Sequence, residues 1–278
     1  MASVPFLKMH GLGNDFVVVD ARTRALALSD AQAHAIADRR TGVGCDQIIT
    51  MAPAKGADAF MRIQNADGGE VEACGNAARC VADLIMREAG REDATIETVA
   101  GTLRARRAES GRVAVDMGPA RLDWREIPLA WECDTLRVPF EMDGYREPVA
   151  VNMGNPHAVF FVPDAEAVPL AEIGPRIERA LMFPQRVNVE FVQVLGPRRL
   201  RMRVWERGVG ITRACGSGAC AAAVAAARRD LAERRVDVVL DGGTLELEWR
   251  ADGHVVMTGP VATSFAGELG DALLGATA

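Results

Sequence analysis

One short phrase occurs twice in this chain of 278 residues, and the repetition limits what the chain can fold into. "ACGNAARC" covers residues 73–80 and "ACGSGAC" covers residues 214–220, so Cys74 and Cys215 lie 141 positions apart, close to half the chain length. Repetition at a fixed offset indicates two copies of one structural unit. The sequence therefore predicts two homologous halves packed about a pseudo-twofold axis.

The same offset produces three further matches without a gap. They are Gly13-Asn14 with Gly154-Asn155, Gln47 with Asn188, and residues 61–65 with residues 202–206. Gly118-Pro119 is the expected crossing point between the halves, because this dipeptide punctuates regular structure. We expect a first domain of residues 1–118 and a second of residues 119–266, with residues 267–278 as candidates to return to the first.

Apolar runs rich in β-branched and aromatic residues predict matching strands in the two halves. These runs are 16–19, 60–63, 95–99 and 113–116 in the first half, and 158–162, 200–204, 244–249 and 254–258 in the second. An Ala-rich stretch after each repeated cysteine predicts a helix, at about 76–88 and about 217–232. Because both stretches look apolar nearly all round, each helix should lie inside its half with strands wrapped around it.

Composition and charge exclude several classes of protein. A net charge of −6 argues against a nucleic-acid surface, and the brief basic runs 104–107 and 198–201 read as solvated strand or turn faces. No secretory signal or membrane-length apolar stretch is recognisable, so we expect a cytoplasmic protein with no membrane partner. Six cysteines in such a chain are expected to be thiols, and their spacing does not match a structural zinc site, so no metal is expected.

A cysteine directly before a helix lies near unpaired backbone N–H groups and the positive end of the helix dipole, which favours the thiolate. Cys74 and Cys215 both precede the helices that the Ala-rich stretches predict. The glycines that follow, Gly75 and Gly216, let a carboxylate approach the same N–H groups closely. The alternative is that each cysteine is a small buried core residue. The duplication favours the functional interpretation, because it makes the two thiols equivalent.

If the halves face each other across a cleft, two thiols approach one carbon atom from opposite sides. A thiolate that removes a proton from one face, and a thiol that supplies one to the other, invert the configuration of that carbon. A pyridoxal enzyme would need a Schiff-base lysine, but Lys8 and Lys55 are the only lysines and lie outside the repeated motifs. The sequence therefore predicts a racemase or epimerase without a cofactor, acting on a small molecule.

Further polar side chains at repeated positions suggest the wall of a small-molecule site. Asn14, Gln47, Asn65, Asn155 and Asn188 are flanked by apolar strands, where an amide is costly unless it has a hydrogen-bond partner. For Asn14 and Asn155 the alternative is turn chemistry beside glycine or proline.

The repeat is not exact at Asn65, because the residue 141 positions later is Glu206, which is followed by Arg207. A carboxylate accepts hydrogen bonds from an ammonium group, and a guanidinium binds a carboxylate in a bidentate manner. These charges on one side only would suit a substrate with an asymmetric tail.

Six motifs, in order along essentially the whole chain, resemble the diaminopimelate epimerase family. They are "MHGLGNDFVVVD", "RRTGVGCDQII", "NADGGEVEACGNAARC", "NMGNPHAVFFV", "RVNVEFV" and "WERGVGITRACGSGAC". The resemblance implies an α+β fold of two pseudo-symmetric domains, each a mixed sheet or barrel curled around a central Ala-rich helix, with the active site between them. It also implies cofactor-independent interconversion of LL- and meso-2,6-diaminopimelate, a step in lysine and peptidoglycan precursor synthesis.

The resemblance also implies roles for individual residues. Cys74 and Cys215 would be the base and acid, and His157 and Glu206 would tune the thiols and the reacting amino group. The other substrate-binding residues would be Asn14, Gln47, Asn65, Gly75, Asn76, Asn155, Asn188, Arg207, Gly216 and Ser217. For His157 the alternative is a strand-edge histidine bonded to the backbone.

The sequence departs from the family pattern at Ala73, Ala77 and Ile211, where methionine, glycine and an acidic residue are common; altered packing is expected there. Two alternative functions stay open. One is another cofactor-independent racemase of this scaffold, such as a proline racemase, and the other is a redox-sensing thiol protein without enzymatic activity. The sequence also leaves open whether the protein forms a homodimer.

Overall fold

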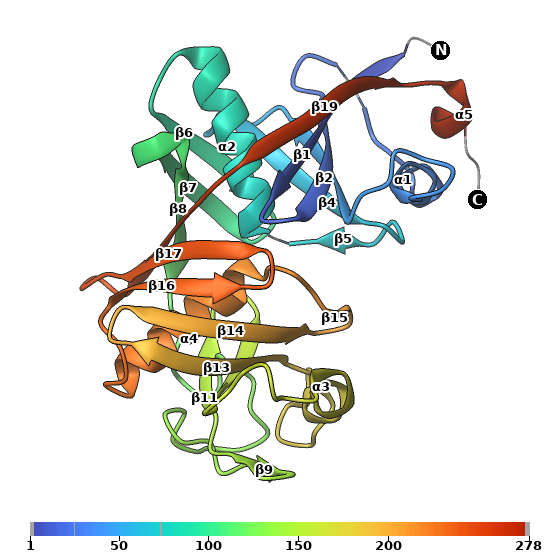
Figure 1. Cartoon of the computed structure of the whole chain (residues 1–278). Helices are drawn as coiled ribbons and strands as arrows, with labels where there is room; N and C mark the ends of the chain where they lie inside the picture. The colour runs from blue at the N-terminus through green and yellow to red at the C-terminus, as the bar shows by residue number, and fades with distance from the viewer. Residues whose placement is uncertain (1–2, 25, 73, 276–278) are drawn as a thin grey trace. The chain divides into compact units, whose positions relative to one another are not determined.

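The computed structural model describes residues 3–24, 26–72 and 74–275. The chain divides into two compact units: unit 1 comprises residues 1–115 with 259–278, and unit 2 comprises residues 116–258. The sequence placed the first crossing at 118 and the return at 267. The return begins eight residues earlier because β19, Ala262–Leu269, pairs along its length with β1, Val4–Gly11, of unit 1. Figure 1 shows these two strands, from opposite ends of the chain, side by side.

Unit 1 is a mixed sheet with two main helices and a short C-terminal one. Its further strands are β2 (Asn14–Asp20), β3 (Gln47–Ala52), β4 (Ala59–Asn65), β5 (Glu70–Val71), β6 (Asp93–Thr98), β7 (Gly101–Arg107) and β8 (Val113–Pro119), which continues into unit 2. The helices are α1 (Asp30–Ala37), α2 (Gly75–Ala89), the 3-10 turn η1 (Glu109–Gly111) and α5 (Asp271–Leu274). β1 and β2, β3 and β4, and β6 and β7 pair antiparallel, while β2 with β3 and β4 with β6 pair parallel.

Unit 2 repeats this order. Its strands are β11 (Val149–Asn152), β12 (Pro156–Phe161), β13 (Asn188–Gly196), β14 (Arg199–Glu206), β15 (Gly210–Ile211), β16 (Arg235–Leu240), β17 (Gly243–Trp249) and β18 (His254–Gly259), and its helices are α3 (Leu170–Glu178) and α4 (Gly216–Arg228). A separate hairpin joins β9 (Glu141–Met142) to β10 (Tyr145–Arg146). β12 with β13 and β14 with β16 pair parallel, as their counterparts do in unit 1.

Strand register supports the internal duplication residue by residue. Phe16 lies opposite Gln47 between β2 and β3, and His157 lies opposite Asn188 between β12 and β13, which is the same pairing moved by 141 positions. The prediction that no gap occurs is wrong after the central helices. Asp93 pairs with Arg106, whereas Arg235 pairs with Glu248, so the offset there is 142. One extra residue in unit 2 follows the end of the helix.

The central helices are buried by the strands around them, as the sequence predicted. α4 contacts β11 to β14, β16 and β17, and every residue from Gly218 to Ala226 is buried. Cys80 in α2 and Cys220 in α4 are both completely buried, so these two side chains are part of the packing between each helix and its strands. α2 is less apolar than expected, since Arg79 and Asp83 are also buried within it. Arg107 and Arg87 form ion pairs with Asp83, while Arg79 donates to the amide oxygen of Asn76.

The second central helix ends four residues before the predicted position. Arg229 is its C-cap, and Asp230 adopts a left-handed conformation with φ 56°, which an α-helix cannot continue through. The Ala-rich pattern overstated the helix because composition near a helix end does not record the backbone angle that stops it.

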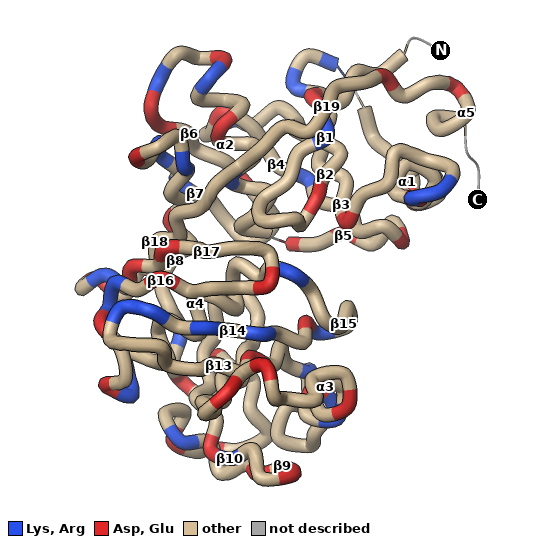
Figure 2. The backbone as a smooth tube through the Cα atoms, in the orientation of Figure 1, with Lys and Arg blue, Asp and Glu red and all other residues tan. Residues whose placement is uncertain are grey.

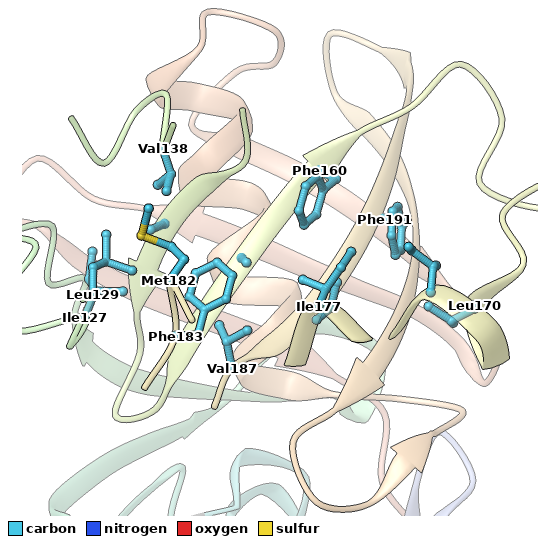
Figure 3. Close-up of a cluster of buried hydrophobic side chains, with 14 of the residues drawn as sticks. Ile127, Leu129, Val138, Phe160, Leu170, Ile177, Met182, Phe183, Val187 and Phe191 are labelled. Atoms are coloured by element: carbon cyan, nitrogen blue, oxygen red, sulfur yellow. The ribbon is translucent and has the colours of Figure 1, made fainter. Parts of the chain in front are cut away.

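A hydrophobic core of unit 2 packs α3 against the sheet. In Figure 3 Phe160 of β12 and Phe191 of β13 lie close to Ile177 and Leu170 of α3. The two phenyl rings stack with centroids 5.4 Å apart. Figure 2 shows basic residues along β14. Arg198 and Arg199 are exposed, as predicted for the basic run at 198–201, but the Arg201 side chain is only 14% exposed and pairs with Glu166 and Asp241. Leu200, Met202 and Val204 alternate with these arginines and point into the core.

Candidate active site

In unit 1, Cys74 is the N-cap of α2, and its extended backbone places the thiol at the helix entrance. Its side chain is partly exposed and supplies no capping hydrogen bond to the helix. Cys74 Sγ lies 3.9 Å from Asn14 Oδ1, which makes a weak thiol-to-amide hydrogen bond. The predicted location of the thiol, immediately before the central helix, is therefore confirmed.

Asn14 is held in one orientation by Asp46, which directly precedes β3, and by Asn76 of α2. Its amide nitrogen donates to Asp46 Oδ2 at 2.9 Å, which turns Oδ1 toward α2. There Asn76 Nδ2 donates to Asn14 Oδ1 at 3.1 Å, and Arg79 Nη2 donates to Asn76 Oδ1 at 2.8 Å. The sequence indicated Asn14 and Asn76 but not Asp46, which immediately precedes Gln47 and fixes the amide. Leu12 and Gly13 have positive φ values of 57° and 86°, and Asn14 follows them at the start of β2, so the turn expected beside Gly13 is present.

Gln47 and Asn65 lie opposite each other at the ends of β3 and β4. Gln47 Nε2 donates to Asn65 Oδ1 at 2.9 Å. Gln47 Oε1 is buried and has no hydrogen-bond partner among the described residues. An orphaned buried acceptor is costly, so this oxygen is available to a donor from a ligand. Unit 1 therefore gathers Asn14, Gln47 and Asn65 near one end of the sheet.

In unit 2, Cys215 is the N-cap of α4 and is 5% exposed. Ser217 Oγ lies 3.6 Å from its sulfur. Burial raises the pKa of the Cys215 thiol well above its ordinary value, and the negative charges of Glu206 and Glu190 raise it further. The helix entrance alone predicted a stabilised thiolate, and for Cys215 the direction is the opposite. Desolvation and two carboxylates outweigh the hydrogen bonds from Ser217 and the Gly218 backbone.

His157 is completely buried on β12, which corrects the alternative of a strand-edge histidine bonded to the backbone. Its Nδ1 lies 2.7 Å from Glu190 Oε1, and its Nε2 lies 2.8 Å from Asn155 Oδ1. Both ring nitrogens thus face side chains. Glu190, on β13, was missed by the sequence analysis. Its signal was an acidic residue inside the apolar run "NVEFV", where a charge needs a specific partner.

Glu206 ends β14, and Arg207 begins the turn to β15. Burial raises the pKa of the Glu206 carboxyl, although Thr212 and Cys215 donate hydrogen bonds to it. Asn188 shapes the turn: its Oδ1 accepts the Arg207 backbone N–H at 2.9 Å, while its Nδ2 donates to the Pro156 carbonyl at 3.0 Å. Asn188 therefore acts through the backbone here.

A second buried carboxylate, which the sequence did not indicate, supports the same turn. Glu178, at the end of α3, accepts the indole N–H of Trp205 at 2.8 Å and the backbone N–H of Gly208 at 3.0 Å. These two residues flank Glu206 and Arg207. Unit 2 thus holds Glu206 and Arg207 on a turn that the amide of Asn188 and the buried carboxylate of Glu178 fix through hydrogen bonds.

Within the described residues, no cluster of three or more His, Cys, Asp or Glu side chains could hold a metal ion. In that same part of the chain, no helix is both long enough and apolar enough to cross a membrane.

The chain is similar to known proteins along nearly its whole length. A family model described as diaminopimelate epimerase matches residues 6–122 and 149–264. A diaminopimelate epimerase of Rhodospirillum centenum is 62% identical over 271 residues, covering 97% of this chain and 93% of the relative. One of Phenylobacterium zucineum is 58% identical over 269 residues, covering 95% and 97%.

Solved structures with the same fold are more distant in sequence. A predicted epimerase of Pseudomonas aeruginosa has 21% identity and a TM-score of 0.69, covering 96% of this chain and 99% of that one. A hydroxyproline epimerase of Agrobacterium vitis has 17% identity and a TM-score of 0.68, covering 97% and 91%.

Proposed function

Because the chain belongs to the diaminopimelate epimerase family, we propose that it is an isomerase that converts LL-2,6-diaminopimelate to meso-diaminopimelate. This reaction inverts one α-carbon and serves the synthesis of lysine and peptidoglycan precursors. The observation that carries the proposal is that each half of the duplicated chain places a cysteine as the N-cap of its central helix, followed by glycine.

The proposed chemistry uses one thiolate and one thiol. The thiolate takes the α-proton from one face of the carbon, and the electron pair moves into the carboxylate to form an enediolate. The thiol on the other face then donates its proton to the same carbon, so the protonation states of Cys74 and Cys215 are exchanged at the end of the turnover. Atoms and charge balance without a cofactor or an oxidant.

The helix entrances supply what the developing negative charge needs. Backbone N–H groups of Gly75 and Asn76, and of Gly216 and Ser217, are the proposed donors to the α-carboxylate, since the first turn of a helix has N–H groups without intrahelical partners. Donors that already point at the carboxylate need no reorganisation when it gains charge. The glycines permit the close approach that a side chain would obstruct.

The remaining candidates divide into residues proposed to bind the substrate and residues proposed to tune the second thiol, and Glu206 belongs to both. The amides of Asn14, Gln47, Asn65, Asn155 and Asn188 are proposed to bind or orient the polar groups of the substrate, and the open acceptor of Gln47 supports this. Glu206 and Arg207 are proposed to bind an ammonium and a carboxylate respectively. His157 and Glu206 are proposed to tune the second thiol, and their coupling to Glu190 and Cys215 supports that role.

The test is exchange of the α-hydrogen of LL-diaminopimelate with solvent deuterium, measured together with epimerisation under reducing conditions. Cys74→Ala and Cys215→Ala should each lose epimerisation by at least about 100-fold, because each removes one of two proton-transfer groups. Cys133→Ala is the matched control, since that thiol is partly exposed and lies in neither group of site residues. Full epimerisation by either single site variant would disprove the two-base mechanism.

The same assay separates the alternatives. A redox-sensing thiol protein would show no exchange by the reduced parent, and Cys74→Ala would be indistinguishable from it. A proline racemase would exchange the α-hydrogen of proline and gain nothing from Arg207. We expect Arg207→Ala to raise KM for diaminopimelate strongly.

We further propose that the enzyme works in the cytoplasm, with diaminopimelate as its small-molecule partner. We also propose that the chain can form a homodimer. Sedimentation equilibrium of the purified chain distinguishes monomer from dimer directly.

A further inference from the structure

The duplication is broken at three positions of unit 2, where Glu190 contacts His157 and packs against Gly218. The residues of unit 1 at the 141-residue offset are Phe16, Ile49 and Ala77, all completely buried. Their counterparts in unit 2 are His157, Glu190 and Gly218, also buried. Three apolar side chains in one half are thus replaced in the other by a histidine, a carboxylate and a glycine.

Glu190 has no access to solvent and few partners. Its side chain is 0% exposed, as is that of His157, and the 2.7 Å contact between Oε1 and Nδ1 joins them. Its second oxygen, Oε2, has no hydrogen-bond partner among the described residues. A buried carboxylate is expensive to maintain, and replacing such groups with apolar ones is often neutral or stabilising. Stability therefore gives little reason for this carboxylate.

Gly218 shows how closely Glu190 approaches the second thiol. A Cβ atom at residue 218 would lie 2.8 Å from Glu190 Oε1 and 3.3 Å from Cys215 Sγ. The carboxylate and the sulfur therefore both pack against the same α-carbon, in the space that Ala77 fills with a methyl group in unit 1. Glycine here makes room for a charge.

The contact with Glu190 determines where the His157 ring carries a proton. A carboxylate only accepts hydrogen bonds, so Nδ1 of His157 must carry a proton to bond with Glu190. Nε2 faces Oδ1 of Asn155, a proposed substrate-binding residue, and an amide oxygen also only accepts, so Nε2 must carry a proton to bond there. In this arrangement both ring nitrogens donate, and the acidic group that orients the histidine also sets how the histidine meets its next partner.

Resting on the proposed function, we propose that Glu190 is a positioning residue of the epimerase, which holds the Nδ1 proton of His157 and so fixes the His157–Asn155 arrangement beside Cys215. Glu190 does not touch the reacting carbon. Glu190 orients His157, and its negative charge also acts on the Cys215 thiol; Ile49, its counterpart in unit 1, can do neither.

Nitrogen-15 NMR of histidine-labelled protein tests the arrangement without any turnover. The His157 ring should show a proton on Nδ1 that exchanges slowly with water. Glu190→Leu removes both the charge and the acceptor and should abolish this signature, whereas Glu190→Gln keeps an acceptor oxygen and should retain it in part. A parent ring protonated at Nε2 alone, or an unchanged ring in Glu190→Leu, overturns the proposal.

Kinetics test the consequence. Glu190→Leu should lower kcat about 10-fold or more with KM near that of the parent, as is typical when the carboxylate behind a functional histidine is removed. Glu190→Gln should lie between. Asp83→Asn is the control, because it alters a buried carboxylate of unit 1 that contacts neither cysteine; it should reduce stability and leave kcat and the His157 signal unchanged. A kcat loss equal in the control and in Glu190→Leu contradicts the proposal.

Gly218→Ala provides a second route if Glu190→Leu does not fold. Its methyl group should displace Glu190 without removing the charge, so the Nδ1 signature should weaken and kcat should fall. An unaltered ring signal in this variant counts against the proposal. If the parent itself fails to exchange the α-hydrogen, the proposed function fails, while the NMR result still decides whether Glu190 holds His157.

Discussion

At the scale of single residues, the two repeated cysteines are chemically different although the chain makes them equivalent. Cys74 is partly exposed and borders neutral amides, while Cys215 is buried beside two carboxylates. A two-base mechanism needs one group protonated and the other not at the start of each turnover. The environment of Cys215 favours its thiol form in the enzyme without substrate.

Alkylation should reveal this difference. At neutral pH iodoacetamide should modify Cys74 and Cys133 first, because both are partly exposed, and Cys215 much more slowly, because burial and charge disfavour its thiolate. Cys45 and Cys80, with pKa values raised to about 11 and about 12, should be protected too. Peptide mass spectrometry over time gives the order, and unfolded protein is the control. Modification of Cys215 before Cys74 would contradict this assignment.

The raised pKa of Cys215 also predicts a dependence of stability on pH. Above the ordinary thiol value of 9.0 the unfolded chain loses this proton and the folded chain keeps it, so the unfolded state is favoured as pH rises. The contribution is fully present below pH 9 and is lost as pH rises toward the folded pKa. Cys215→Ala should therefore flatten the alkaline fall of the unfolding free energy, measured by urea denaturation from pH 8 upward. An unchanged slope would argue against the shift.

At the scale of elements, α3 fixes the charged turn of unit 2 through a close contact. A Cβ atom at Gly174 in the middle of α3 would lie 2.6 Å from the Trp205 ring, and Trp205 is bonded to Glu178 of the same helix. Trp205 immediately precedes Glu206. The position of the helix thus determines where Glu206 and Arg207 lie.

Gly174→Ala should therefore destabilise the protein, although alanine is the better helix former. Overpacking against the indole should cost about 1–3 kcal/mol, which exceeds the gain of about 1 kcal/mol in helix propensity. Thermal unfolding measures the stability, and KM for diaminopimelate reports the displaced turn. Gly196→Ala is the control, since a Cβ there meets nothing within 4 Å. A stabilised Gly174→Ala variant would show that the contact can relax.

At the scale of the whole molecule, the first unit is built from both ends of the chain. A core cluster in unit 1 combines Val4 and Phe6 of β1, Ile36 of α1 and Leu269 of β19. Because β19 supplies both hydrogen bonds to β1 and apolar contacts to this core, unit 1 depends on the last part of the sequence.

Leu269→Ala should loosen unit 1 selectively. Loss of a completely buried leucine should cost about 2–5 kcal/mol, and hydrogen exchange should accelerate at β1 amides while β14 and β16 amides keep their protection. Phe265→Ala, on the same strand but 50% exposed, is the control and should change little. Equal acceleration in both units would show that they unfold as one.

The sequence by itself determined the duplication, the order of strands around two central helices, and the placement of Cys74 and Cys215 at helix entrances. Repetition and hydrophobic periodicity are properties of the order of residues, so they can be recognised without a structure. The sequence also indicated the amides and the Glu206-Arg207 dipeptide, because polar residues beside apolar strands require partners. The sequence did not predict where α4 ends, because the left-handed backbone of Asp230 stops that helix.

Only the tertiary structure decided the electrostatics. Asp46, Glu178 and Glu190 come from different elements than the residues they orient, and their importance depends on burial that no local pattern reports. The same cause reversed the expected pKa direction at Cys215: the helix dipole is encoded nearby in sequence, but the stronger desolvation and the carboxylates of β13 and β14 are brought to the thiol only by folding.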